Sequence, residues 1–335
     1  STSDARRIYS SRQVDDSLVV DGENFRQPEL ADALELLAIE GEQVFYQGEM
    51  GSELIAACGT GGGYLQQADL YGYQVVKREP LDYHYRNARI LTNPPPSSGG
   101  SLIRFAHALL EPHDQGDFGS AQHLTLLTEV LRQTNLARME NRQDETAGSG
   151  DILHPETITR FRAALAGHPV NSRGTTHISV VDGQGNAASL SLSNGEGSGY
   201  VLPGTGIMLN NMLGEEDLNP GGFHCWDTAV RVSSMMAPTL AIDHDRVIAT
   251  GSCGSNRLLT AILQTLNNLY YFGMDVRDAV DSPRLHVEQD LLSIEPGFPE
   301  SAVDEVCTGY TNHNQWAEKN LYFGGTHTVV HDSRG

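Results

Sequence analysis

The chain has 335 residues, of which 39% are apolar and 19% charged, so it is long enough to hold one large globular domain or two smaller ones. Its formal net charge of −21 disfavours nucleic-acid and anionic-membrane partners, because phosphate binding requires clustered cations. The four cysteines are widely separated without a C-x-x-C pair, which excludes a dense disulfide scaffold, and no apolar stretch reaches the ~18 residues of a membrane span.

The first half of the chain predicts helices joined by glycine- and proline-containing loops. The polar composition of residues 1–24 predicts a poorly ordered start, and leucines at helical spacing predict a helix from Pro28 to Gly41. The stretch 73–77 predicts a strand, and the charged, glycine-containing stretch 140–152 predicts an exposed loop. Further helices are expected over 102–109, 124–131 and 155–165.

The second half opens with a predicted β-hairpin. Thr175 begins an apolar, β-branched run, and a second run of alternating small and apolar residues covers 187–193. The sequence Asp-Gly-Gln-Gly at 182–185 is typical of a hairpin turn. Antiparallel pairing of the two strands would bring Thr175 close to Ser193. Later elements are expected at 247–249 (strand), 255–270 (helix) and 321–330 (strand).

Thr175 is the strongest catalytic candidate. It directly follows the polar and flexible pair Arg173-Gly174. If the Gly174–Thr175 bond is broken, Thr175 gains a free α-amino group, whose ordinary pKa of roughly 7.7–8.0 allows it to act as a base near neutral pH. A hydroxyl and an amine on one residue form a nucleophile–base pair. A threonine that opens a strand usually has a structural role, so other features must support this hypothesis.

Three other segments support it. Ser233 and Ser234 form a double serine in an apolar context, and Gly206 to Asn211 is a further glycine- and asparagine-containing segment. Residues 250–257 contain a turn of small residues between a predicted strand and a predicted helix. Such a turn presents backbone N–H groups at a helix N-terminus, which is what an oxyanion hole requires.

Weaker patterns do not predict sites of their own. The glycine-rich stretch 195–199 is followed by Pro203-Gly204 rather than by a helix, which argues against a nucleotide loop. His177 and Ser179 share one strand face while Asp182 lies in the turn, so a Ser-His-Asp triad is not expected. The 13 histidines show no H-E-x-x-H spacing, and neither a metal nor another cofactor is predicted.

With these motifs in place, the chain resembles the γ-glutamyltranspeptidase (glutathione hydrolase) family. The resemblance covers most of residues 20–330 in the family's order and includes the Thr175 motif, the double serine and the turn at Gly254. Further matching segments are Arg-Gln-Pro-Glu-Leu-Ala at 26–31, Glu-Gln-Val-Phe-Tyr-Gln-Gly at 42–48, Pro-Pro-Pro-Ser-Ser-Gly-Gly at 94–100 and Ser-Pro-Arg-Leu-His at 282–286.

The resemblance implies an α+β fold, the αββα four-layer sandwich of the N-terminal-nucleophile hydrolases. It also implies that the precursor cleaves itself between Gly174 and Thr175. Residues 1–174 would then be the C-terminal part of the large-subunit region and residues 175–335 the small-subunit region. The two pieces would stay associated as one domain that lacks the family's N-terminal region, which carries an arginine that holds the donor's carboxylate.

The resemblance also implies roles for individual residues. Thr175 would be nucleophile and base, with Ser193 at the position of a threonine that hydrogen-bonds the nucleophile. The backbone N–H groups of Gly254 and Ser255 would hold the oxyanion. Substrate binding is implied for the remaining matched positions: Ser233 and Ser234 for the α-carboxylate, and Asn194 and Glu215 for the rest of the donor.

The sequence departs from the family's pattern at two places. The segment after the second strand is about two residues short, so Asn194 matches the family's asparagine only if the gap is shifted. Met212 and Glu215 stand where many members carry a glutamine and an aspartate that hold the substrate's α-amino group. Glu215 supplies a carboxylate, whereas Met212 supplies no amide.

The implied activity is cleavage of the γ-glutamyl amide of glutathione or a related donor through a threonyl acyl-enzyme, with water or an amino acid as acceptor. A related acylase for glutaryl or β-lactam side chains, or a poly-γ-glutamate hydrolase, is an alternative that Met212 favours. An inactive relative that acts as a binding protein is another. We expect a fragment of a longer chain, which would be periplasmic or secreted if its N-terminus carries a signal peptide and cytoplasmic otherwise.

Overall fold

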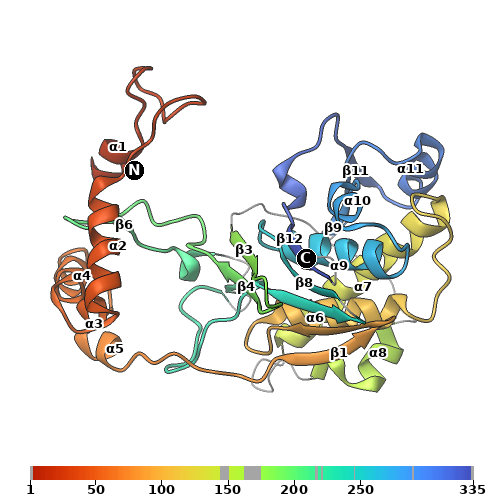
Figure 1. The fold of residues 1–335 in the computed structure, drawn as a ribbon, viewed down its shortest axis with the longest axis horizontal. Coiled ribbons are helices and arrows are strands. Elements are labelled where there is room, and N and C mark those ends of the chain that lie inside the picture. The colour runs from red at the N-terminus through yellow and green to blue at the C-terminus, as the bar shows by residue number, and fades with distance from the viewer. Residues whose placement is uncertain are drawn as a thin grey trace. The chain divides into compact units, whose positions relative to one another are not determined.

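A computed structural model describes residues 3–143, 151–161, 175–215, 218–219, 222–244, 246–288 and 290–332. The chain forms two compact units (Figure 1). The first unit comprises residues 1–77 and 194–212, and the second comprises residues 78–193 and 213–335. Among the described residues, no helix combines the length and the hydropathy that are needed to cross a membrane.

The first unit is mainly helical and has a small core. Leu54, Leu70 and Leu202 are its clustered buried residues. Strands β5 and β6 pair antiparallel, which brings Leu202 to this cluster. The elements of this unit are α1 (Ser3–Tyr9), α2 (Pro28–Glu40), α3 (Gln43–Tyr46), α4 (Glu49–Thr60), α5 (Gln67–Tyr71), β5 (Val201–Leu202) and β6 (Ile207–Met208), followed by the 3₁₀ turn η3 (Met212–Gly214) at its boundary.

Two expectations for the first unit are wrong. The start of the chain is helical at α1, where the Arg7 guanidinium donates to both carboxylate oxygens of Glu29 at 2.9 and 2.8 Å. Residues 73–77 form no strand, although 28–40 form the predicted helix. The Tyr73 ring stacks on Tyr46 with the ring centroids 4.9 Å apart.

The second unit is built on a five-stranded antiparallel sheet with the strand order β1-β2-β7-β8-β12. Thr92 pairs with Thr239, Thr239 with Thr250, and Thr250 with Thr328, so these four threonines form one row across the sheet. The strands are β1 (Leu81–Tyr85), β2 (Ala88–Thr92), β7 (Thr239–Asp243), β8 (Arg246–Gly251) and β12 (His327–His331).

Helices cover one face of this sheet and a hairpin covers the other. Ile248 of β8 belongs to the main core together with the buried residues of α6 and α9. Gly251, three residues along the same strand, faces His177 of the hairpin instead. The elements concerned are α6 (Ser98–Leu110), α7 (Ala121–Gln143), α9 (Arg257–Tyr270), and the hairpin strands β3 (Thr176–Val181) and β4 (Ala187–Leu192).

The remaining elements of the second unit surround this core. Strand β10 lies between β9 and β11 in a second, three-stranded sheet. The remaining elements are the 3₁₀ turn η2 (Asp151–Leu153), α8 (Pro155–Phe161), α10 (Val276–Asp281), β9 (Leu285–Glu288), β10 (Leu291–Ile294), α11 (Glu300–Cys307), β11 (Asn312–Gln315) and the 3₁₀ turn η5 (Leu321–Phe323).

The mixed helix and sheet content confirms the α+β class, whereas the four-layer sandwich stays a prediction. The helices predicted around 102–109, 124–131 and 255–270 and the hairpin are confirmed. The predicted loop over 140–152 is wrong at its start, because α7 continues to Gln143. The strand expected at 321–330 is instead η5 followed by β12, since Gly324 adopts a left-handed conformation between them.

Candidate active site

The β3–β4 hairpin places Thr175 beside Ser193. Thr176 pairs with Leu192 at the open end of the hairpin, so the residues just outside this pair face each other. The Thr175 hydroxyl donates to the Ser193 hydroxyl over a long distance of 3.5 Å, and Thr175 is half-buried. The predicted proximity is therefore confirmed, and the candidate nucleophile has access to solvent.

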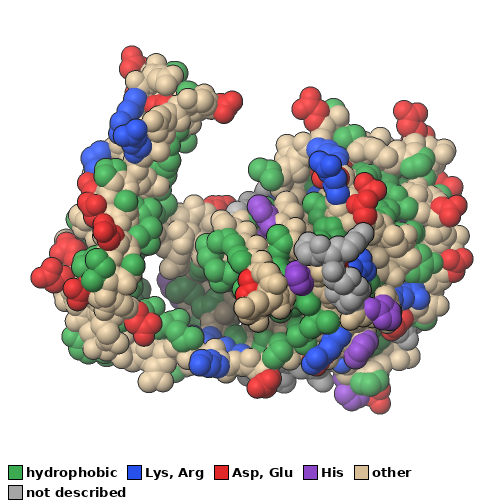
Figure 2. Space-filling model, in the orientation of Figure 1, with side chains coloured by type: hydrophobic (Ala, Val, Ile, Leu, Met, Phe, Trp, Pro, Cys, Tyr) green, Lys and Arg blue, Asp and Glu red, His purple; other side chains and the backbone are tan. Residues whose placement is uncertain are grey.

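The hairpin turns its polar face inward. His177, Ser189 and Ser191 point toward the five-stranded sheet, while Ile178 and Leu190 are exposed on the outer face. Figure 2 shows hydrophobic side chains gathered over this hairpin. Because the face in contact with the sheet is polar, hydrogen bonds rather than apolar packing determine where the hairpin lies.

These hydrogen bonds connect the hairpin to three strands of the sheet. The Ser179 hydroxyl donates to the His327 carbonyl of β12 at 2.9 Å. The Ser189 hydroxyl donates to the Thr250 carbonyl of β8 at 3.0 Å and accepts from the Thr239 N–H of β7 at 3.0 Å. The hairpin is therefore held along both of its strands.

The same bonds determine the tautomer of His177. The His177 Nε2 lies 3.0 Å from the Ser179 hydroxyl and 3.4 Å from that of Ser189, and both hydroxyls donate their proton to a carbonyl. Nε2 must therefore carry the proton, and Nδ1 accepts from Ser191 at 2.8 Å. Burial, with a smaller contribution from the charge of His327, lowers the pKa of His177 to about 4, so the ring is neutral at neutral pH.

Gly251 provides the space for this ring. A Cβ atom at Gly251 would lie 2.2 Å from Cε1 of His177, a distance that no side chain tolerates. The absence of a side chain at Gly251 therefore lets the hairpin approach β8 closely.

The direction of the hairpin brings its open end toward the end of β8. At the turn end, Gly185 lies against His331, which pairs with Val247 near the start of β8. At the other end of the hairpin, near the start of β3, His177 lies over Gly251 at the end of β8. Since the chain runs steadily along the sheet between these contacts, Thr175 lies toward the edge from which the 252–255 turn emerges.

The turn after β8 has the properties of an anion-binding turn. Gly254 has φ +105° and Ser255 has φ +51°, and the turn leads directly into α9 through bonds from Arg257 N–H to Gly254 O and from Leu258 N–H to Ser255 O, both at 3.0 Å. Among the described residues, no hydrogen bond from the Gly254 N–H is found. The positive end of the α9 dipole adds to the attraction for an anion.

The double serine reaches the same sheet edge. Ser234 lies five residues before Thr239, the first residue of β7, and both serines are half-buried. The Ser234 carbonyl accepts from the Ser98 N–H at 2.9 Å, and its hydroxyl lies 3.2 Å from that of Ser97. The start of α6 is therefore part of this edge, which the residue-by-residue assignment from the sequence missed, although the Pro-Pro-Pro-Ser-Ser-Gly-Gly match contained the signal.

The other positions predicted from the sequence are Glu215, Asn194 and Gly174. Glu215 is 6% exposed, and its carbonyl accepts from the Asn219 side-chain amide at 2.7 Å. Asn194 belongs to the first unit, where its carbonyl accepts from the Asn211 N–H at 2.8 Å. Gly174, the residue before the predicted cleavage point, lies outside the described residues. In the described part of the chain, no group of three or more potential metal ligands converges.

Comparison with known proteins identifies the family. A sequence model of the gamma-glutamyltranspeptidase family matches residues 1–335 of this chain. The chain belongs to the gamma-glutamyltranspeptidase family. The resemblance drawn from the sequence is thereby confirmed.

Relatives in the gamma-glutamyltranspeptidase family differ in their named activities. Acylase ACY 1 proenzyme of Pseudomonas sp. (strain SE83) is 32% identical over 303 residues, covering 84% of this chain and 53% of that protein. The glutathione hydrolase proenzyme of Escherichia coli (strain K12) is 30% identical over 312 residues, covering 83% of this chain and 54% of that protein. This chain therefore spans about half the length of these relatives.

A solved structure shows the same fold. Cephalosporin acylase from Bacillus halodurans matches with a TM-score of 0.83 and 22% identity, covering 100% of this chain and 64% of that protein. At this identity the match shows the fold alone. It agrees with the α+β fold expected for the gamma-glutamyltranspeptidase family.

The close contact between Gly251 and His177 predicts a large effect of a small substitution. Gly251→Ala should lower the free energy of unfolding by about 1–3 kcal/mol, because the added methyl displaces the buried ring. Gly183→Ala, in the turn of the same hairpin, has open space around it and serves as the control. Urea denaturation measures both variants, and equal effects would contradict the proposed steric role of Gly251.

The pKa of His177 predicts a loss of stability in acid. Its folded-state pKa of about 4 lies below the ordinary 6.5, so the unfolded state binds more protons between these values. Stability is complete above pH 6.5 and falls as the pH drops toward 4. His177→Gln should reduce the slope of unfolding free energy against pH in this window by at most about 1.4 kcal/mol per pH unit. Urea denaturation at several pH values between 4 and 7 measures this slope, and an unchanged slope in the variant would contradict the assignment to His177.

Proposed function

We propose that this protein is an N-terminal-threonine amidohydrolase or transferase that acts on γ-glutamyl amides. The observation that carries the proposal is the position of Thr175, half-buried beside Ser193 at the open end of the hairpin. This end of the hairpin is directed toward the sheet edge that carries the left-handed Gly254–Ser255 turn. A nucleophile and a set of N–H donors at one edge are the minimum requirement for acyl transfer.

The proposed reaction has two halves. After hydrolysis of the Gly174–Thr175 bond, the Thr175 Oγ attacks the amide carbonyl while the new α-amine accepts the hydroxyl proton. The N–H groups of Gly254 and Ser255 stabilise the oxyanion, and the proton is returned to the leaving amine as the ester forms. Water or an amino acid then attacks the ester and releases the γ-glutamyl product and Thr175. The Ser193 hydroxyl orients the nucleophile.

The donor is held through its charged groups in this proposal. Ser233 and Ser234 bind the α-carboxylate through their hydroxyls, and the carboxylate of Glu215 binds the α-ammonium group. Because the sequence supplies Met212 where many relatives have an amide, Glu215 becomes the main recognition element for the ammonium group.

A related acylase activity is the second candidate. Met212 supplies no amide for an ammonium group, and one of the relatives above is named an acylase. A glutaryl donor lacks the α-ammonium group and needs no partner for it. The two candidates therefore share Thr175 chemistry and differ in whether the α-ammonium group contributes to binding.

Thr175→Ala should abolish both self-cleavage and turnover, because it removes the nucleophile of both reactions. Thr175→Ser keeps a hydroxyl and an α-amine and should retain both at a reduced rate. A denaturing gel measures cleavage into the pieces 1–174 and 175–335, and chromophore release from a γ-glutamyl anilide measures turnover. Normal processing of the Thr175→Ala variant would refute the assignment of Thr175.

The donor is tested by comparing γ-glutamyl and glutaryl anilides. We expect a higher kcat/KM for the γ-glutamyl anilide, and Glu215→Gln should reduce this preference by about tenfold, since a charge-assisted hydrogen bond contributes about 1.5–3 kcal/mol. Glu300→Gln, an exposed carboxylate at the start of α11, serves as the control and should leave the preference unchanged. A wild-type preference for the glutaryl anilide would favour the acylase.

A further inference from the structure

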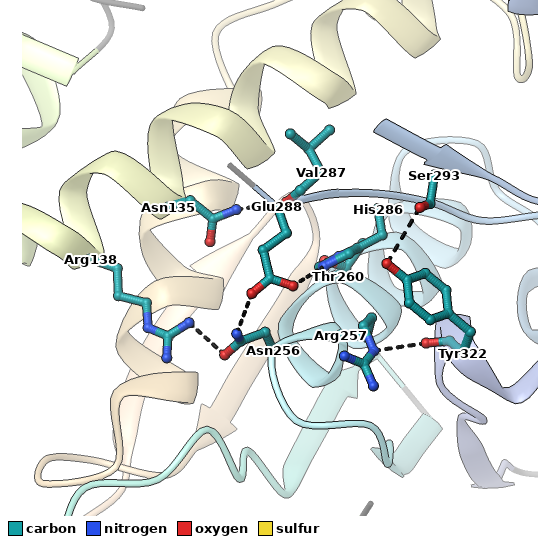
Figure 3. Close-up of polar contacts among 10 residues, drawn as sticks. All are labelled: Asn135, Arg138, Asn256, Arg257, Thr260, His286, Val287, Glu288, Ser293 and Tyr322. Carbon is teal, nitrogen blue, oxygen red and sulfur yellow. Dashed lines mark hydrogen bonds and ion pairs between the residues drawn. The ribbon is translucent and has the colours of Figure 1, made fainter. Parts of the chain in front are cut away.

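A buried chain of hydrogen bonds ends next to the proposed oxyanion turn and has no role in the chemistry described above. The Arg138 guanidinium of α7 donates to Oδ1 of Asn256 at 2.6 Å, and Nδ2 of Asn256 donates to Oε1 of Glu288 in β9 at 2.6 Å (Figure 3). All three residues are at most 8% exposed. The Asn256 amide therefore lies between a buried cation and a buried anion.

The two charges determine the orientation of the amide. A rotated amide would direct its NH₂ group at the guanidinium donors and its oxygen at the carboxylate, which would leave buried charges unpaired at a cost of several kcal/mol. The amide also separates the two ions and allows each to keep a charge-assisted hydrogen bond. Asn256 is thus held in one orientation from both sides.

Neighbouring groups keep Glu288 in place. His286 Nε2 lies 3.3 Å from Oε2 of Glu288, and His286 Nδ1 lies 2.8 Å from the Thr260 hydroxyl. Burial lowers the pKa of His286, so the neutral ring donates from Nε2 and accepts at Nδ1. Although burial opposes ionisation, the hydrogen bonds from His286 and Asn256 and the charge of Arg138 hold the pKa of Glu288 below its usual range.

The residue before Asn256 has an unfavourable backbone conformation. Ser255 has φ +51°, a region in which a residue with a Cβ atom costs roughly 1–3 kcal/mol and persists only when its surroundings fix it. On the far side of the turn, the Arg257 Nε donates to the Tyr322 carbonyl at 2.9 Å, and the guanidinium lies 4.9 Å from the centre of the Tyr322 ring. The turn is therefore restrained by Asn256 and by Arg257, which are consecutive residues.

We propose that Asn256, held between Arg138 and Glu288, is a positioning residue that keeps the Gly254–Ser255 turn in its left-handed conformation. In that conformation the turn presents its N–H groups to the oxyanion without reorganisation, which is where such groups gain their catalytic effect. The catalytic consequence rests on the proposed function, whereas the effect on the backbone does not.

A single exchange of the amide tests the proposal. Asn256→Asp keeps the acceptor for Arg138 but places a carboxylate oxygen against Glu288. We expect kcat with the γ-glutamyl anilide to fall on the order of 10–10²-fold with KM within about threefold, and the Cα and Cβ NMR shifts of Ser255 to move away from left-handed values. In the double variant Asn256→Asp/Glu288→Gln, the new amide at position 288 donates to the new carboxylate. This double variant should recover kcat to within about fivefold of the wild type and restore the Ser255 shifts.

Asn135→Asp is the matched control. The Asn135 amide, also on α7, donates to the Val287 carbonyl of β9 at 2.7 Å, so the same chemical change weakens the same pair of elements without touching the turn. The control should lower stability and leave both kcat and the Ser255 shifts unchanged. An equal loss of kcat in the control, unchanged Ser255 shifts in Asn256→Asp, or no recovery in the double variant would overturn the positioning role. A wild-type protein that neither cleaves itself nor turns over either anilide would refute the proposed function, and the Ser255 shifts would still decide the role of Asn256.

Discussion

The position of the candidate nucleophile depends on the contact between the His177 ring and the backbone of Gly251. The ring occupies the space that a side chain at Gly251 would fill, and its two nitrogens bond to serines on both strands of the hairpin. Ser179 and Ser189, whose hydroxyls both lie next to Nε2, in turn donate to carbonyls of the sheet. One neutral imidazole thus connects the hairpin to the sheet, and Thr175 lies only two residues before it. A change in the charge or the size of this contact should therefore displace the end of the hairpin that carries Thr175.

The hairpin face that contacts the five-stranded sheet is polar and its outer face is apolar, which is the reverse of the usual arrangement. Ile178, Val180, Leu190 and Leu192 are between 46% and 53% exposed, while the inward positions carry histidine and serine. An apolar sheet face is stabilised when another layer of secondary structure covers it. The predicted four-layer sandwich would place a layer of helices on this face. This chain covers 53% and 54% of the two curated relatives above.

How much the sequence could predict depended on whether a feature is local. The hairpin was predictable because its turn residues and alternating strands lie within 20 residues, and this placed Thr175 beside Ser193. The strand predicted at 73–77 was wrong because a short β-branched stretch forms a strand only with a partner, and no strand of the described sheets pairs with it. Strands β1 and β2 were not predicted, since a run such as Leu-Asp-Tyr-His-Tyr does not separate from loop composition by pattern alone. The family motifs compensated for these gaps by fixing the order of the catalytic segments.

The polar network around Asn256 shows why positioning residues escape sequence analysis. Its members Arg138, Asn256 and Glu288 are separated by 118 and 32 residues along the chain, and only Asn256 lies in a segment that the sequence pattern singles out. Their relation exists only after α7, α9 and β9 pack together. A helix-start asparagine would ordinarily be assigned to capping, yet its side chain makes no capping bond here. The candidate nucleophile Thr175 and the Gly254–Ser255 turn are thus each restrained by a separate polar network, one neutral and one ionic. Because both networks are required at the same sheet edge, the geometry of the proposed reaction is determined by residues that take no part in its chemistry.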